Sequence, residues 1–221
     1  SPDIHKKFEK RFNIPIIETM GLTETGSQIT TNPMPPGQRK IGSPGKAYGN
    51  QIMIGDDQFE ALPAGETGEI LVKGDNVMQG YFKQPEETHK TILGNGWLRT
   101  GDLGYLDTDG YVFVSGRIKE LIIKGGENIA PREIDEALLN HPSILEAAAF
   151  AVPCNDYGER VEACVLLKEK VSVELDELKS FCENQIGKFK SPDNIHIVAE
   201  LPKGPSGKVQ RLKLLELIYE N

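Results

Sequence analysis

The pattern of apolar and turn residues changes at Gly116, and this change constrains the fold more than any other feature of the sequence. Between about residues 41 and 115, short strand-like runs alternate with turn sequences such as Asp107–Gly110. This alternation predicts a small β-rich unit. After Gly116, helical patterns alternate with strand-like runs, which predicts a compact α+β domain of about 100 residues.

Apolar runs bounded by turn residues predict the strands of both parts. In the first part they lie at residues 51–54, 69–73 and 111–115, with one more run upstream at 14–17. In the second part they lie at residues 147–152, 161–167 and 195–198. A proline-rich connector over residues 32–37 separates the upstream run from the β-rich unit.

Helical spacing of apolar residues predicts three helices. The first starts at the Ser1-Pro2 pair, a helix-start signal, and carries on one face Ile4, Phe8 and Phe12. The second opens at Pro131 and carries on one face Ile134, Ala137, Leu138 and His141. The third covers Glu174–Ile186, stops at Gly187, and directs inward Leu175, Leu178, Cys182 and Ile186. Because the chain opens without methionine directly on a helix start, we interpret it as an excised fragment.

Charge and cysteine content exclude several classes of function. The 25 Lys+Arg and 33 Asp+Glu give a net charge of −8, so general binding to nucleic acid or an anionic membrane is not expected. Any anionic ligand must be held by local groups. The three cysteines lie far apart and the four histidines lack ligand spacing, which argues against a disulfide framework or zinc site. No transmembrane run or signal peptide is apparent, and we expect a cytoplasmic protein.

Two stretches in the first part are predicted to be polar loops and are candidates for nucleotide binding. In Thr23–Gly26, hydroxyls and a glycine-freed backbone suit a phosphate, and the Glu24 carboxylate suits Mg²⁺. In Trp97–Asp102, an aspartate beside a glycine can accept hydrogen bonds from both hydroxyls of a ribose. Each stretch, taken alone, is also compatible with an ordinary solvated turn.

Two further stretches flank or belong to the second part. Glycine and charged residues at 116–120, followed by the paired glycines within 123–128, suit a hinge and a loop that approaches a ligand with its backbone. Both are equally compatible with turns that flank a strand. Near the carboxyl end, Pro205–Arg211 is a short rigid loop around one lysine, Lys208, which alone would be read as a solvated surface residue.

Five segments, in this order, resemble motifs of the adenylate-forming superfamily, which contains acyl- and aryl-CoA synthetases, peptide-synthetase adenylation domains and beetle luciferases. They cover nearly the whole chain and read "MGLTETG", "GEILVKGDNVMQGYF", "WLRTGDLGYLDTDGY", "GRIKELIIKGGENIAPREIDEAL" and "PSGKVQR". Within this superfamily, "KGGENIAPREID" and the connector "TNPMPPGQRKIGSPGKA" are most similar to acyl-CoA synthetases.

The resemblance implies a two-step ligase that uses ATP, Mg²⁺ and coenzyme A. A carboxylic acid attacks the α-phosphate of ATP to give acyl-AMP and pyrophosphate, and the thiol of CoA then displaces AMP. Carried over by position, Thr23 would contact phosphate and Glu24 would hold Mg²⁺. Asp102 would bind the ribose hydroxyls of ATP/AMP, with Arg117 beside it. Met20 stands where the family often has an aromatic residue near the adenine, and Gly21 follows it.

The resemblance also assigns roles in the second part. Lys119 would be the hinge residue about which the C-terminal domain swings between the two steps. Gly125 and Gly126 would line the pantetheine path, and Lys208 would reach the α-phosphate and the carboxylate. A fixed ammonium aimed at the phosphorus stabilises the transition state more than the ground state.

The fold class expected is a multidomain α/β and α+β protein. Residues 1–39 would be a remnant of the large AMP-binding domain, 40–115 a β-rich distorted barrel, and 116–221 a mobile C-terminal α+β domain with its hinge at 116–119. The family's phosphate loop and most of its acyl pocket lie upstream, so we expect the fragment to be inactive without the missing N-terminal half. Two alternatives remain open: an amino-acid adenylation domain that loads a carrier protein, and a non-catalytic nucleotide-binding module.

Overall fold

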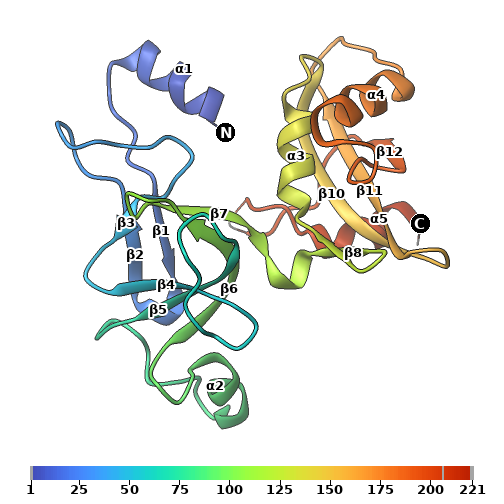
Figure 1. Cartoon of the computed structure of the whole chain (residues 1–221). Helices are drawn as coiled ribbons and strands as arrows, with labels where there is room; N and C mark the ends of the chain where they lie inside the picture. Colours follow the sequence, from blue (N-terminus) through green and yellow to red (C-terminus); the bar gives the residue numbers. More distant parts are fainter. Residues whose placement is uncertain (1, 206, 220–221) are drawn as a thin grey trace. The chain divides into compact units, whose positions relative to one another are not determined.

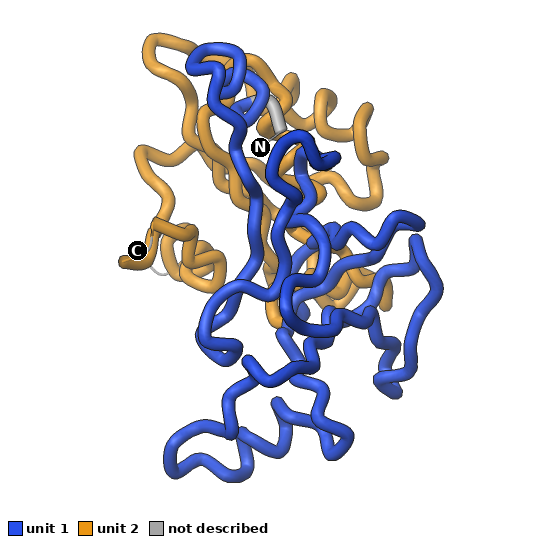
Figure 2. The backbone as a smooth tube through the Cα atoms, turned by 90° about the vertical axis from the view of Figure 1, so that its left-hand side faces the viewer, with its two compact units in different colours: residues 1–118 blue, residues 119–221 orange. Residues whose placement is uncertain are grey.

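The computed structural model describes residues 2–205 and 207–219 as a mixed α/β protein with several sheets. Ser1, expected as the cap of the first helix, and Ser206, in the lysine loop, lie outside the described residues. The chain divides into two compact units, Ser1–Ile118 and Lys119–Asn221, which are coloured separately in Figure 2. The division falls within the segment where the sequence places the hinge.

The first unit contains an N-terminal helix, two antiparallel sheets and shorter helices in the connections (Figure 1). The helix is α1 (Pro2–Phe12). One sheet has the order β1-β2-β3, with strands β1 (Thr19–Leu22), β2 (Ser27–Thr31) and β3 (Lys46–Ala47). The other has the order β4-β5-β6-β7, with strands β4 (Gln51–Gly55), β5 (Gly68–Lys73), β6 (Leu98–Leu106) and β7 (Val112–Arg117). Short helices are η1 (Thr23–Thr25) and α2 (Pro85–Thr91).

The first predicted helix is confirmed, but the chain does not cover its apolar face. Ile4, Phe8 and Phe12 are 68%, 40% and 52% exposed, although they lie at the spacing of one face. Phe8 and Phe12 contact each other with ring centroids 4.7 Å apart. The helix is therefore held to this unit mainly by polar contacts rather than by a buried apolar stripe.

The strand predicted at residues 14–17 is wrong, because this run is irregular and the first strand begins at Thr19. Pro15 has no N–H to donate to a ladder. The N–H of Ile16 donates instead to Glu9 Oε1 at 2.7 Å, and its carbonyl accepts from Arg39 Nη1 at 2.9 Å. Side chains thus satisfy the backbone groups that a strand partner would otherwise take.

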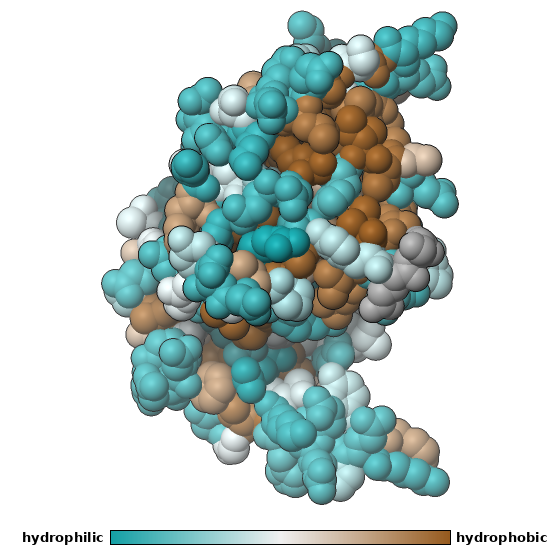
Figure 3. Space-filling view, turned by 90° about the vertical axis from the view of Figure 1, so that its right-hand side faces the viewer, coloured by the Kyte–Doolittle hydropathy of each residue, from teal (hydrophilic) through white to brown (hydrophobic). Residues whose placement is uncertain are grey.

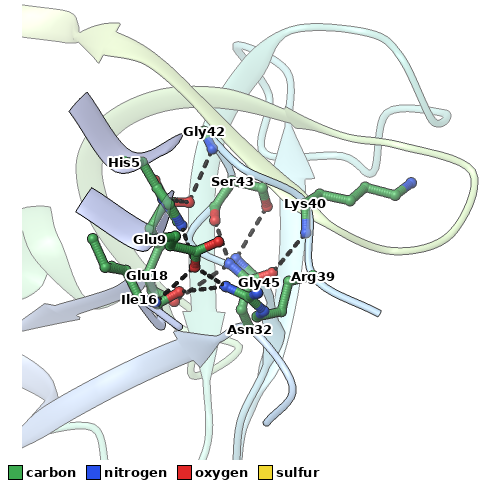
Figure 4. A network of polar contacts seen from close by, with 10 residues as sticks. All are labelled: His5, Glu9, Ile16, Glu18, Asn32, Arg39, Lys40, Gly42, Ser43 and Gly45. Carbon is green, nitrogen blue, oxygen red and sulfur yellow. Dashed lines mark hydrogen bonds and ion pairs between the residues drawn. The ribbon is translucent and has the colours of Figure 1, made fainter. Parts of the chain in front are cut away.

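A polar network joins α1 to the chain segment over residues 39–45 (Figure 4). The Glu9 carboxylate lies at its centre and accepts hydrogen bonds from Arg39, Ile16 and His5. His5 is buried and also lies 3.3 Å from Glu18 Oε2, which accepts from the N–H of Gly42. The hydrogen bond from Arg39, then that from the Ile16 N–H, lowers the pKa of Glu9 from 4.5 to about 2.

We expect Glu9→Gln to remove a stabilising contribution that depends on pH. Because the folded-state pKa lies below the ordinary value, the contribution is complete above about pH 4.5 and is lost as pH falls towards 2. Urea unfolding followed by fluorescence of Trp97, the chain's single tryptophan, measures the first unit. The stability difference from wild type should shrink between pH 4.5 and 2, whereas a difference that stays constant would contradict this role of Glu9. Glu66→Gln, at an exposed position, is the control.

The second unit is a mixed sheet with helices on both faces. Its sheet has the order β10-β11-β8-β9, and β12 pairs in parallel with β11. The strands are β8 (Ile122–Lys124), β9 (Glu127–Ile129), β10 (Ile144–Cys154), β11 (Gly158–Leu167) and β12 (Asn194–Ile197). The helices are α3 (Pro131–Leu139), α4 (Leu175–Ile186), η3 (Arg211–Lys213) and α5 (Leu214–Tyr219), and η2 (Ile118–Glu120) spans the division between the units.

Strand β10 explains how both faces of this sheet are covered. Ala149 belongs to a core shared with α3 and α4, whereas its neighbours Ala148 and Phe150 pack in a core that includes Leu214 of α5. Successive side chains of a strand point to opposite faces, so a continuous apolar run is what a doubly covered strand requires. The run predicted over 147–152 is confirmed as the middle of this longer strand.

The helices of the second unit follow the predicted pattern with two exceptions. All four residues predicted to share one face of the helix from Pro131 are buried, but α3 ends at Leu139, so His141 lies beyond the helix. In α4, Leu178 and Cys182 are fully buried, and Gly187 caps the helix with φ +80°, as expected. Leu175, predicted to point inward, is 46% exposed, because it is the first residue of the helix and precedes the turn that contacts the sheet.

Some apolar side chains remain at the surface of the second unit, among them Leu145, Ile197 and Leu212. In the space-filling view, hydrophobic side chains gather in one area of a largely hydrophilic face (Figure 3). The three cysteines are free. Among the described residues, none of the helices combines the length and apolar character needed to cross a membrane.

Candidate functional site

The Thr23–Gly26 loop is a single 3₁₀ turn between β1 and β2. Thr25 is buried, and its hydroxyl donates to the carbonyls of Leu22 and Ser27 at 3.0 and 3.1 Å. Gly26 ends the turn with φ +67°, a conformation that favours glycine. Thr25 thus fixes the turn from within, while Thr23 is exposed.

Close approach of β1 and β2 requires Gly21. A Cβ at this position would lie 2.4 Å from the carbonyl oxygen of Ser27, so a larger residue would push the strands apart. An open groove runs along these strands, lined by Thr19, Gly21, Leu22, Thr23, Gly26, Ser27 and Gln28. Met20 alternates to the opposite side, where it packs against the core of Ile54, Ile70 and Val112. Any contact of Met20 with a ligand in the groove would therefore come from its backbone.

Glu24 is held in place by the segment around Tyr81. The Tyr81 hydroxyl donates to Glu24 Oε1 at 2.9 Å, and the Met78 N–H donates to the Glu24 carbonyl at 2.8 Å. Burial, and then the hydrogen bond to Glu24, raises the pKa of Tyr81, which keeps the hydroxyl protonated as a donor. Tyr81 was not predicted as a site residue, although it lies in the segment "GDNVMQGYF" that resembles a family motif.

Asp102 lies within strand β6, so the interpretation of Trp97–Asp102 as a loop is wrong. Asp102 pairs across the ladder with Arg117 of β7, whose Nε donates to Asp102 Oδ1 at 2.9 Å. The Asp102 side chain is only 11% exposed, and its backbone N–H donates to the hydroxyl of Thr100 at 3.0 Å. Strand pairing, rather than a turn, therefore orients this carboxylate.

Buried Glu69 supports the backbone that precedes Asp102. Its Oε1 accepts from the N–H of Gly101 at 3.0 Å, and its Oε2 accepts from Arg99 Nε at 3.0 Å. Gly101 has φ +71°, and the β5–β6 register is irregular between Glu69 and Leu71. Glu69 thus holds the irregular part of the strand in a defined conformation.

In the second unit, Gly125 and Gly126 form the turn between β8 and β9. Their φ values are +60° and +86°, and the Gly125 N–H donates to the Tyr157 carbonyl at 2.9 Å. A Cβ at Gly125 would lie 3.3 Å from Tyr157 Cδ1. The absence of a side chain at Gly125 therefore keeps the space beside the Tyr157 ring free.

A pocket that no sequence pattern predicted lies beside this turn. Its lining combines two aromatic rings with three lysines: Lys124, Tyr157, Lys179, Glu183, Lys188, Phe189, Ser191, Pro192 and Asp193. The buried Lys124 places its Nζ 5.4 Å from the centroid of the Phe189 ring and 3.1 Å from Asp193 Oδ2. These residues come from distant parts of the chain, so no local sequence motif predicts the pocket.

Lys208 projects from a tight turn at the base of α5. The N–H of Gly204 donates to the Lys208 carbonyl at 2.9 Å, and Lys203 and Val209 form an isolated antiparallel bridge around the turn. Gly207 has φ +77°. Lys208 is exposed, and no hydrogen bond of its ammonium to another described residue is found. Lys119 is likewise exposed, in η2 at the division between the units.

The predicted site residues thus fall into separate groups. Thr23 and Glu24 share one turn, Asp102 and Arg117 form one cross-strand pair, and both groups belong to the first unit. Gly125, Gly126 and Lys208 belong to the second unit.

Comparison with known proteins matches two separate parts of the chain to sequence patterns of AMP-binding enzymes. The sequence pattern of the AMP-binding enzyme family matches residues 1–82, and that of the AMP-binding enzyme C-terminal domain matches residues 133–208. The chain is 52% identical over 214 residues to a sulfoacetate–CoA ligase of Cupriavidus necator, a match that covers 97% of this chain and 42% of the relative. It is 41% identical to an oxalate–CoA ligase of Saccharomyces cerevisiae, covering 98% of this chain and 40% of the relative.

Solved structures extend the likeness to the fold. ATP-bound MatB from Rhodopseudomonas palustris matches with a TM-score of 0.93 at 34% identity, over 100% of this chain and 44% of that one. The chain therefore spans less than half the length of the relatives it matches.

Proposed function

The chain belongs to the AMP-binding enzyme family, and from this premise we propose that it is the C-terminal part of an ATP-dependent acid–CoA ligase. In the first step a carboxylate oxygen attacks the α-phosphorus of ATP, and pyrophosphate leaves with the electrons of the broken P–O bond. In the second step the CoA sulfur attacks the acyl carbon and AMP leaves. The observation that carries the proposal is the 52% identity to a CoA ligase across nearly the whole chain.

Glu24 is the proposed Mg²⁺ ligand, and its surroundings fit that role. Oε1 is occupied by the Tyr81 hydroxyl, and the second oxygen can coordinate an ion. The described residues contain no cluster of three or more potential metal-ligating side chains. One protein carboxylate, completed by substrate phosphates and water, is a common coordination set for Mg²⁺. When bound, the ion would neutralise charge on the phosphates, and the hydroxyl of Thr23 would contact the same phosphates.

Asp102 is the proposed ribose ligand. Its carboxylate has one oxygen fixed by Arg117, and hydrogen bonds to an ionised acceptor are stronger than those between neutral groups. The groove at Gly21 is the proposed binding site of this unit for the nucleotide and the acid substrate. Ser27 and Gln28, which line it, are candidates to contact the acyl group. Most of the acyl pocket would be supplied by residues upstream of this chain.

Lys208 is the proposed catalytic cation of the first step. Its exposed ammonium on a tight turn can be aimed at the non-bridging oxygens on which negative charge gathers during attack at phosphorus. A rotation at the exposed Lys119 would deliver the lysine for adenylation and withdraw it before the thiol arrives.

The pocket lined by Tyr157 and Phe189 in the second unit is the proposed binding site for the nucleotide part of CoA. The faces of Tyr157 and Phe189 suit a purine ring, and lysine ammonium groups suit its phosphates. The adjoining Gly125 and Gly126 would leave room for the pantetheine arm, because neither carries a side chain.

Purified full-length protein that contains this chain tests the proposal directly. Carboxylic acids that include sulfoacetate, oxalate and simple monocarboxylates are each supplied with ATP and Mg²⁺, and pyrophosphate and acyl-AMP are measured. CoA or a carrier-protein thiol is then added. We expect acyl-AMP with one acid class and thioester formation with CoA.

Thioester formed only with the carrier would favour an amino-acid adenylation domain, and no adenylate with any acid would favour a non-catalytic module. The 221-residue chain alone is expected to be inactive in pyrophosphate exchange.

We expect Tyr81→Phe to raise the Mg²⁺ concentration required for half-maximal adenylation by about 5- to 10-fold, the equivalent of one lost hydrogen bond of about 1–1.5 kcal/mol. Without the hydroxyl, Glu24 loses the donor that fixes its carboxylate. Tyr105→Phe is the matched control, because the Tyr105 ring stacks on Phe113 away from Glu24. An unchanged Mg²⁺ requirement in Tyr81→Phe, at normal folding, would argue against this role.

A further inference from the structure

Arg211 is the last residue of the segment that contains Lys208. Among the described residues of the second unit, its side chain donates more hydrogen bonds than that of any other lysine or arginine. Its guanidinium forms a two-pronged contact with Asp135 of α3, with Nη2 2.7 Å from Oδ2 and Nη1 3.3 Å from Oδ1. Nη1 also donates to the carbonyl of Ala149 on β10. Nε donates to Glu120 Oε2 at 3.2 Å, and the arginine side chain is only 14% exposed.

These contacts lie at the base of the lysine turn. Gln210, the residue before Arg211, donates its N–H to the Pro202 carbonyl at 2.8 Å, which closes the turn that carries Lys208. Arg211 then fixes this base against a helix and a strand of the sheet. Asp135 is itself fixed, because its Oδ1 accepts from the N–H of Ala149 at 2.6 Å. The turn is therefore attached to the rigid part of the unit three residues after the lysine.

The Glu120 contact links the same arginine to the segment next to Lys119. Glu120 is the residue that follows Lys119, and it lies 91 positions before Arg211 in the sequence. A rotation at Lys119 moves the domain as one body only if the backbone that leaves the hinge is tied to that body. The Glu120–Arg211 contact provides such a tie, and it uses the same guanidinium that fixes the lysine turn.

We propose that Arg211 is a positioning residue for adenylation, which fixes the base of the Lys208 turn against Asp135 and ties it through Glu120 to the hinge at Lys119. This inference rests on the proposed function, since it needs Lys208 and Lys119 in their assigned roles. Arginine suits this position because its planar fork satisfies two carboxylates and a carbonyl at once, which a lysine ammonium cannot do in the same geometry.

The test uses the full-length protein and compares the two half-reactions. In Arg211→Lys, we expect the rate of acyl-AMP formation at saturating ATP to fall about 10- to 100-fold, the loss typical of a reacting group misplaced by about 1 Å. The KM for ATP should change less than about threefold, and so should thioester formation from supplied acyl-AMP, because neither depends on Lys208. Arg132→Lys, which alters an exposed arginine paired with Glu136 on α3, is the matched control.

A second variant keeps the inference testable if Arg211→Lys does not fold. Glu120→Gln keeps an acceptor of the same shape, leaves the Asp135 pair intact, and should still slow acyl-AMP formation several-fold with little change in the other half-reaction. Equal losses in both half-reactions, or unchanged adenylation in a folded Glu120→Gln, would overturn the inference while leaving the proposed function standing. A wild-type protein that forms no acyl-AMP with any acid would overturn both.

Discussion

Replacing Lys208 with alanine is expected to slow acyl-AMP formation in the full-length enzyme by about 100-fold or more. The loss corresponds to at least about 3 kcal/mol, the scale found when one preorganised group that stabilises transition-state charge is removed. The ammonium would act on oxygens whose charge grows during attack at phosphorus, so the transition state loses more than the bound substrate does. Pre-steady-state measurement of acyl-AMP separates this step from thioester formation.

Thioester formation from supplied acyl-AMP provides the internal comparison for Lys208→Ala. This step should change little, because the lysine would have left the reaction centre before the thiol enters. Lys213→Ala is the matched control, since Lys213 is an exposed lysine shortly after this segment, at the end of η3. If Lys208→Ala slows both half-reactions equally, or if Lys213→Ala has the same effect, the assigned role is wrong.

The second large effect is expected at Glu162, a carboxylate with 0% exposure in the middle of β11. It accepts hydrogen bonds from four side chains at 2.7–3.0 Å, which are those of Arg160, Asn194, His196 and Tyr219. Two of these donors lie on β12 and one on α5, so the carboxylate connects the edge of the sheet to the C-terminal helix. The Lys208 turn precedes this helix, with only the short helix η3 between them.

We expect Glu162→Ala to destabilise the second unit by about 3–5 kcal/mol, the range for removing one partner of a buried charge network. The donors, which are themselves partly exposed, would lose their shared ionised acceptor, and a hydrogen bond to a charged group contributes more than one between neutral groups. Urea unfolding followed by hydrogen exchange at β10 and β11 measures this unit, whereas Trp97 fluorescence reports the first unit and should change much less. Glu169→Ala, at an exposed position shortly after β11, is the control. A loss below about 1 kcal/mol would contradict the proposed importance of the network.

The Glu162 contribution should also depend on pH. Burial raises the pKa of Glu162, but the hydrogen bonds, that from His196 first, outweigh burial and lower it below the ordinary value of 4.5. A carboxylate whose pKa is lowered by folding stabilises the protein above its unfolded pKa, and this stabilisation is lost as pH falls through the folded value. The stability difference between wild type and Glu162→Gln should therefore be complete above about pH 4.5 and shrink below it.

Local sequence patterns predicted most of the regular structure correctly. The strands at 51–54, 69–73 and 161–167 and the helix from Pro131 follow from spacing alone, because burial of one or both faces imposes a period that short-range sequence displays. The errors at 14–17 and 97–102 have one cause. In both, residues distant in the sequence decide which backbone groups are satisfied. At Ile16 these are the side chains of Glu9 and Arg39, and at 97–102 they are the neighbouring strands β5 and β7 together with the Glu69 carboxylate.

The sequence by itself determined the family and the order of the candidate motifs, since each motif is a contiguous stretch whose turn residues and charges are visible without a fold. Only the tertiary structure decided which groups support those motifs. Tyr81 reaches Glu24 across 57 residues, and Arg211 reaches Glu120 across 91. Hydrogen bonds act over about 3 Å and depend on strand register and helix packing, which local patterns do not encode. Supporting contacts of this kind therefore become visible only when the chain is folded.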